Sequence, residues 1–191
     1  MLKNLKYLKV IDPDPTALIL EKIRIAGDLF KDWGEYFFKD KKFINFLEKY
    51  KTAIFKSNEL MEKLGSFEEC YICSVEENKG CCKIGLENEV TINVLLINMF
   101  FKTPIPQERE VPGRCFFVGP TGCKIFARPY LCREFFCNRL LRLFSPEEYA
   151  LLTQTISYEL TLLYEISVYI RKELEFLLGD FLLELDIAGY R

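Results

Sequence analysis

The sequence contains no histidine at any of its 191 positions. This absence removes the most common general base, the most common metal ligand and every Ser-His or Cys-His nucleophile arrangement. Any metal site in this chain must therefore be built from cysteine thiolates, with Asp or Glu carboxylates as the only strong substitutes.

The chain also lacks an excess of positive charge, a secretory signal and a long uninterrupted apolar run. Its net charge of −2 argues against a nucleic-acid-binding protein, because such proteins neutralise phosphates with Lys and Arg. Residues 1–9 alternate lysine with apolar residues and contain no small-residue cleavage site. The most apolar segment, residues 150–170, carries Glu159 and Glu165 and would be costly as a membrane span. We therefore expect a cytoplasmic protein without a membrane span, whose thiols stay reduced.

Apolar residues make up half of the chain, with 17 Phe and 10 Tyr among them, which indicates a folded globular protein. The length predicts a single domain spanning residues 1–191. Asp14 and Pro15 form a helix start, and we expect a helical flank over 14–65, with a first helix that runs towards Gly34.

The sequence Ser145-Pro146-Glu147-Glu148 combines an N-cap, a first-position Pro and a third-position Glu, and it predicts a long helix. We expect this second helical flank over 145–188, with Gly179 ending or breaking the helix. The predicted fold is mainly α, with long N- and C-terminal helices around a small irregular region that contains a short β-hairpin.

This irregular region, residues 66–140, holds all of the cysteines and is called the cysteine region below. Ser66 to Glu69 has the form of a capping box ahead of the first cysteine. Residues 115–126 predict a hairpin around Gly119 to Gly122, with a cysteine on each side of the turn. The stretch 90–101 is compatible with a strand or a buried helix, because periodicity alone does not separate them.

Eight cysteines in under seventy positions point to a metal centre rather than to scattered buried thiols. Disulfides are the main alternative, but they would require export, and adjacent cysteines do not readily pair with each other. The predicted ligands are Cys70, Cys73, Cys81, Cys82, Cys115, Cys123, Cys132 and Cys137. They suit an iron–sulfur cluster, of the 4Fe-4S type, or Zn2+ in tetrahedral sites.

Arg128 and Arg133 flank Cys132 in the sequence. Because a tetrathiolate centre carries net negative charge, we expect both guanidinium groups to donate hydrogen bonds to it from the shell around the ligands. Surface salt bridges are the alternative role for these two arginines. Pro129 predicts a helix start, at which the helix dipole would favour a Cys132 thiolate.

The arrangement resembles the zinc- or iron-chelating cysteine-cluster family called YkgJ-like. The matching elements are the Cys70-Tyr71-Ile72-Cys73 pair, the Cys81-Cys82 doublet, and the later run Cys115-Phe116-Phe117, Cys123-Lys124-Ile125-Phe126, Arg128-Pro129 and Cys132-Arg133 through Cys137. The gap of residues 74–80 is longer than the family's usual spacing. The resemblance covers about a third of the chain.

The resemblance implies metal chelation and assigns no specific reaction. We expect the bound centre to have a structural or redox role. Flagellin lysine N-methylases share the cysteine pattern distantly, so the alternative is a metal- or cluster-dependent methyltransferase-like enzyme acting on protein lysine. No glycine-rich loop independently supports a methyl-donor site.

Overall fold

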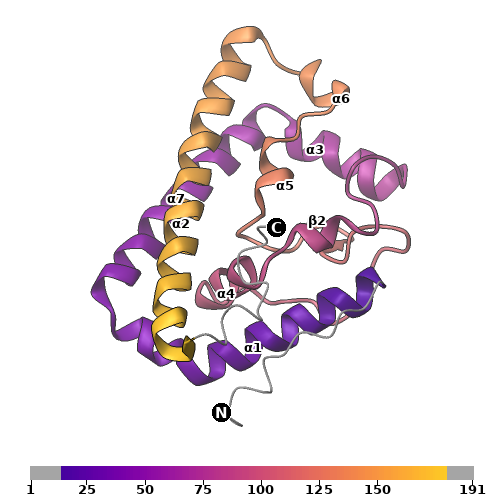
Figure 1. The fold of residues 1–191 in the computed structure, drawn as a ribbon. Coiled ribbons are helices and arrows are strands. Elements are labelled where there is room, and N and C mark those ends of the chain that lie inside the picture. The colour runs from indigo at the N-terminus through magenta and orange to yellow at the C-terminus, as the bar shows by residue number, and fades with distance from the viewer. Residues whose placement is uncertain (1–13, 180–191) are drawn as a thin grey trace.

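The computed structural model describes residues 14–179 and is mainly helical, with one two-stranded antiparallel hairpin (Figure 1). The predicted fold class is confirmed. The elements in chain order are α1 (Pro15–Lys39), α2 (Lys41–Lys63), α3 (Ser66–Tyr71), the π-helical turn η2 (Ile72–Glu76), the 3-10 turn η3 (Leu86–Glu89), α4 (Ile92–Phe100), β1 (Val118–Gly119), β2 (Gly122–Cys123), α5 (Tyr130–Glu134), α6 (Asn138–Leu141) and α7 (Pro146–Leu178). None of the helices between residues 14 and 179 is long and apolar enough to cross a membrane.

Helix α1 begins as predicted but ends later. The Asp14 carboxylate accepts hydrogen bonds from the backbone N–H of Thr16 (2.7 Å) and Ala17 (3.0 Å). The expected end near Gly34 is wrong, because the helix continues to Lys39. One more turn brings Phe37 into the core, where its ring is only 2 % exposed, and this burial outweighs the roughly 1 kcal/mol that a helical glycine costs.

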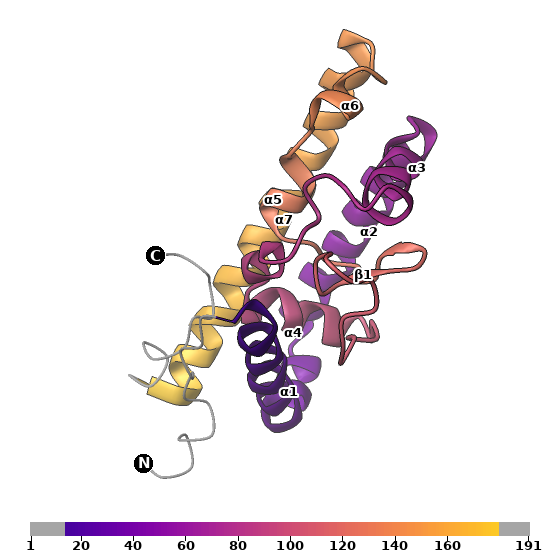
Figure 2. The same cartoon turned by 90° about the vertical axis from the view of Figure 1, so that its right-hand side faces the viewer.

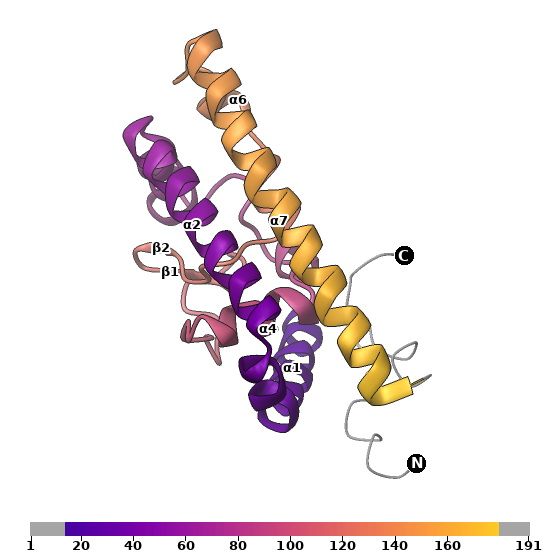
Figure 3. The ribbon, with the colours of Figure 1, turned by 90° about the vertical axis from the view of Figure 1, so that its left-hand side faces the viewer.

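Helices α2 and α7 lie side by side and antiparallel, and form the longest packing contact of the fold (Figures 1 and 3). The predicted capping box of α7 is present: Ser145 and Glu148 bond to each other's backbone N–H groups. Gly179 ends the helix with a φ of 63°, as the sequence predicts. Residues 180–188 of the predicted flank lie outside the described part of the chain.

The open question over residues 90–101 is resolved as helix α4. Thr91 caps it by accepting a hydrogen bond from the Val94 N–H at 3.2 Å, and Lys102, with a φ of 58°, lies just beyond its end. Every residue of α4 except Met99 is buried. A helix that is enclosed on all sides carries apolar residues on all faces, which is why its sequence showed no helical period.

The loops of the cysteine region lie on one side of the α2–α7 pair, and helix α4, which belongs to the same region, packs against α1 (Figures 1 and 2). The first element of this region differs from the prediction. Gly65, with a φ of 72°, is the N-cap of α3, and no side chain caps this helix, so the expected capping box at Ser66 is absent. The long gap before the cysteine doublet is taken up by η2 and by Gly80, which has a φ of 80°. The hairpin is confirmed, with Val118 paired to Cys123.

Candidate metal centre

The eight cysteines are free thiols on five short stretches of the cysteine region. They lie on α3 and η2, in the doublet, beside and within the hairpin, on α5 and at the start of α6: Cys70, Cys73, Cys81, Cys82, Cys115, Cys123, Cys132 and Cys137. No group of three or more Cys, Asp or Glu side chains between residues 14 and 179 is arranged so that it could hold a metal ion. The thiols nevertheless lie close enough to affect one another's ionisation.

A first group of thiols gathers around α3 and η2. Cys70 and Cys73 are one helical turn apart, and a Cβ atom at Gly80 would lie only 2.6 Å from the Cys73 Sγ. The sulfur of Cys73 therefore lies against the backbone that leads into Cys81. Burial raises the pKa of Cys70 to about 11, and the charges of Cys81, Cys137 and Cys73 add to this rise.

Ion pairs hold the last member of this group in place. Arg139, on α6, pairs with Glu77 at 2.9 Å and also with Glu69, which precedes Cys70. Because Cys137 is the N-cap of α6, this bridge between α6 and α3 brings Cys137 towards Cys70.

A second group forms at the hairpin. The backbone N–H of Cys115 donates to the carbonyl of Cys82 at 3.0 Å, and Cys123 lies opposite Val118, whose N–H bonds to the carbonyl of Cys115. Burial raises the pKa of Cys115 to about 12, and Cys123 and Cys132 raise it further. The effect of Cys123 on Cys115, together with the pairing of Val118 and Cys123, is consistent with the predicted approach of the two cysteines through the hairpin.

The doublet joins the two groups. A hydrogen bond with Cys82 lowers the pKa of Cys81 to about 6, and the same bond, with burial, raises the pKa of Cys82. Cys81 affects Cys70 in the first group, whereas Cys82 is affected by Cys123 and Cys132 in the second. Cys81 also raises the pKa of Cys132, so the doublet couples the two groups rather than separating them.

Arg128 lies where the sequence predicts a charge-compensating residue. Its guanidinium lowers the pKa of both Cys70 and Cys132, although burial dominates at each thiol. The guanidinium carbon lies 5.3 Å from the ring centroid of Phe67 on α3, an arrangement that fixes the position of the charge.

Arg133 lies elsewhere. Its guanidinium points into the α2–α7 pair, where it donates to Glu159 at 2.6 Å and to Ser57 at 2.7 Å. Burial raises the pKa of Cys132 to about 12, so the net effect of its surroundings favours the thiol over the thiolate. Helix α5 has only five residues, so its dipole is small compared with the cost of desolvating a thiolate.

Two further residues shape the site, and the sequence reasoning missed both. Asn98 on α4 holds the segment before Arg128: its Oδ1 accepts from Phe126 N (2.9 Å) and Ala127 N (3.0 Å), and its Nδ2 donates to Ala127 O (2.9 Å). Arg114 is buried, donates to the carbonyl of Lys79 and lowers the pKa of Cys81. Asn98 could have been noticed as a polar residue inside an apolar run, and Arg114 as an arginine next to Cys115.

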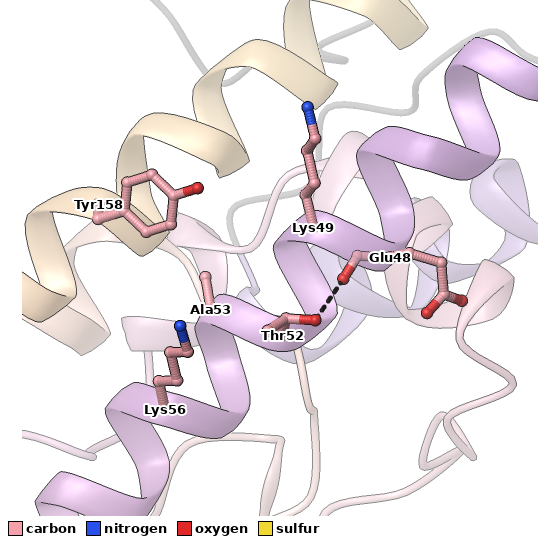
Figure 4. Close-up of a pocket in the computed structure, with 6 residues that line it drawn as sticks. All are labelled: Glu48, Lys49, Thr52, Ala53, Lys56 and Tyr158. Carbon is pink, nitrogen blue, oxygen red and sulfur yellow. Dashed lines mark hydrogen bonds between the residues drawn. The ribbon is translucent and has the colours of Figure 1, made fainter.

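A shallow pocket lies between α2 and α7 and is lined by Glu48, Lys49, Thr52, Ala53, Lys56 and Tyr158 (Figure 4). Its lining contains no cysteine, so the pocket is not a cleft at the metal centre.

No family model, curated protein or solved structure matches this chain.

Proposed function

We propose that this protein chelates a metal through cysteine thiolates, as the resemblance to the YkgJ-like family implies. The metal is Zn2+ or an iron–sulfur cluster of the 4Fe-4S type, and its role is structural or redox. The observation that supports the proposal most is the convergence of thiols from separate stretches between Cys70 and Cys137. Cys81 and Cys137 raise the pKa of Cys70, and Cys123 and Cys132 raise the pKa of both Cys82 and Cys115.

The chemistry of these side chains fits a bound cation. Deprotonating several neighbouring thiols without a cation is unfavourable, because burial and like charges both raise their pKa values. A metal or cluster removes this penalty, since its positive charge stabilises the thiolates. Arg128 provides one further positive charge between Cys70 and Cys132.

The eight cysteines lie in two overlapping groups. Cys70, Cys73, Cys81 and Cys137 lie around α3, and Cys82, Cys115, Cys123 and Cys132 lie at the hairpin, with Cys81 also affecting Cys132 across the two groups. Four thiolates complete a tetrahedral zinc site or ligate one four-iron cluster. When bound, such a centre would crosslink the loops of the cysteine region, and an iron cluster would in addition carry electrons.

The experiment that tests the proposal is metal analysis of protein purified without oxygen. Stoichiometric zinc in a colourless protein identifies a zinc site, and brown protein with iron, sulfide and thiolate-to-iron charge-transfer absorbance identifies a cluster. Folded protein with neither metal contradicts the proposal.

Single substitutions test the ligand set. Cys70→Ser, Cys82→Ser, Cys123→Ser and Cys132→Ser are each expected to lower the metal content. Ser157→Ala is a matched control for the loss of one small polar side chain, since Ser157 is exposed on α7, outside the cysteine region. Full metal content in all four Cys variants would rule out the ligand assignment.

We also propose a cytoplasmic location, because free thiols persist in a reducing compartment.

A further inference from the structure

Helix α5, which carries Cys132, has almost no apolar attachment to the rest of the fold. Arg133 is its only buried residue. The large side chains around it face solvent: Tyr130 is 59 % exposed, Leu131 43 % and Phe135 52 %. The position of this five-residue helix therefore depends on what Arg133 contacts.

Arg133 makes contacts with both long helices. Its Nη2 donates to Ser57 Oγ on α2 (2.7 Å) and to Glu159 Oε2 on α7 (2.6 Å). Its Nη1 donates to Asn58 Oδ1 (3.1 Å) and contacts Met61 Sδ (3.2 Å). We call Arg133 and these four partners the Arg133 cluster.

This arrangement has a higher desolvation cost than an apolar contact at the same place would have. Arg133 and Glu159 are each 1 % exposed, and two buried charges cost several kcal/mol that an apolar pair would avoid. An apolar side chain would hold α5 against the bundle but leave it free to rotate or slide. A planar guanidinium with partners on two helices fixes both rotation and depth.

We propose that Arg133 is a positioning residue that fixes the Cys132 sulfur in the metal centre by attaching α5 to α2 and α7. This inference rests on the proposed function, in which Cys132 is a metal ligand. It assigns Arg133 a role different from charge compensation, because its charge is paired with Glu159.

The test compares Glu159→Gln and Arg133→Lys with the wild-type protein. Both variants keep the size of the side chain but break the paired geometry, and Arg133→Lys retains the charge. Glu165→Gln and Arg171→Lys, at exposed positions on α7, are matched controls. The first measurement is the rate of metal transfer to a chromogenic chelator at a temperature at which every variant is folded. We expect about tenfold faster transfer from the two cluster variants and wild-type rates from the controls.

The second measurement uses metal-free, reduced protein and follows alkylation of each cysteine by mass spectrometry. In Glu159→Gln and Arg133→Lys, Cys132 is expected to react about tenfold faster, whereas Cys115 keeps its wild-type rate. The positioning role would be overturned if alkylation of Cys132 and Cys115 became faster by the same factor, or if neither became faster. The alkylation test needs no metal, so it remains decisive even if the wild-type protein proves to bind none and the proposed function fails.

Discussion

At the residue scale, Asn98 makes more specific contacts than any apolar neighbour on α4. All of its hydrogen-bonding atoms are engaged, including a bond from Nδ2 to Val94 O at 2.8 Å. Asn98→Leu leaves the backbone N–H groups of Phe126 and Ala127 buried without this partner, at about 1–3 kcal/mol each. We predict a loss of about 2–4 kcal/mol in the free energy of unfolding, measured by urea denaturation.

Asn93→Leu is the control for Asn98→Leu on the same helix. Asn93 is equally buried, but only its Nδ2 is bonded, to Ser167 O at 3.2 Å, and its Oδ1 has no partner among the described residues. We expect Asn93→Leu to lower the free energy of unfolding by clearly less than Asn98→Leu does. Equal losses for both variants would mean that Asn98 acts through burial alone and does not hold the segment before Arg128.

Gly80 lies against the Cys73 sulfur, which makes it a second sensitive position. Gly80→Ala would place a Cβ atom 2.6 Å from Cys73 Sγ, and Gly80 also has a φ of 80°. Gly85→Ala is the matched control, because Gly85 has a φ of 97° but no atom within 4 Å of the added Cβ. Both substitutions introduce backbone strain of about 1 kcal/mol, because a residue with a Cβ atom disfavours a positive φ.

We therefore predict that only Gly80→Ala changes the alkylation rate of Cys73 in metal-free protein, and that it destabilises the fold more than Gly85→Ala. Identical behaviour of the two variants would show that strain alone matters at Gly80.

The sequence does not predict what the two arginines beside Cys132 contact. The positions of Arg128 and Arg133 relative to Cys132 suggest the same role for both. Arg128 extends towards the thiols, whereas Arg133 extends towards Glu159, which is 26 positions away in the chain. Local spacing contains no information on that distant partner.

At the element scale, Asp40 joins three helices. Its backbone ends α1, its Oδ1 accepts from Lys42 N at 2.8 Å to cap α2, and its Oδ2 accepts from the Tyr169 hydroxyl on α7. Burial acts to raise the pKa of Asp40, but the bonds from Tyr169 and Lys42 outweigh it and lower the pKa below its usual value.

Asp40→Asn is predicted to reduce stability at neutral pH by about 1 kcal/mol. Because the folded-state pKa of Asp40 is lowered, its carboxylate contributes stability above the unfolded pKa near 3.8, and this contribution is lost as the pH falls through the folded value. The difference between wild type and Asp40→Asn, measured by thermal unfolding from pH 7 to pH 2.5, should therefore shrink below about pH 4. A difference that stays constant with pH would exclude the charge of Asp40 as its cause.

Helix ends were predictable where side-chain chemistry determines them and unpredictable where packing does. Asp14 and Ser145 cap helices as their sequences indicate. Gly34 and Ser66 carry local signals that tertiary structure overrides, because Phe37 continues α1 into the core and Gly65 takes the cap of α3. Helix α4 was ambiguous because burial on every face removes the amphipathic pattern.

At the scale of the whole molecule, the protein combines a helical core with a cysteine region that has little regular structure. One cluster of buried side chains includes residues of α1, α2, α4 and α7 together with Phe116, Phe117 and Ile125 from the hairpin. The count and spacing of cysteines predict a shared centre, but which thiols lie near one another depends on contacts between distant segments, such as Cys82 with Cys115. Sequence patterns do not specify such pairings.

This organisation leads to a prediction for metal removal. The long helices have their own apolar contacts, whereas the thiol-bearing loops are held by few hydrogen bonds and ion pairs, so chelation should weaken the fold without abolishing it. A metal that binds only the native state adds RT ln(1 + [metal]/Kd) to the free energy of unfolding. This is about 4 kcal/mol when the free metal concentration is a thousand times Kd. For a chain of this size we expect removal to lower Tm by roughly 10 °C, while far-UV circular dichroism at 20 °C keeps most of its helical signal. Differential scanning calorimetry before and after treatment with a chelator and reductant, followed by metal addition, measures the shift and its reversal. An unchanged Tm in protein shown to have lost its metal would mean that the bound metal does not stabilise the native fold.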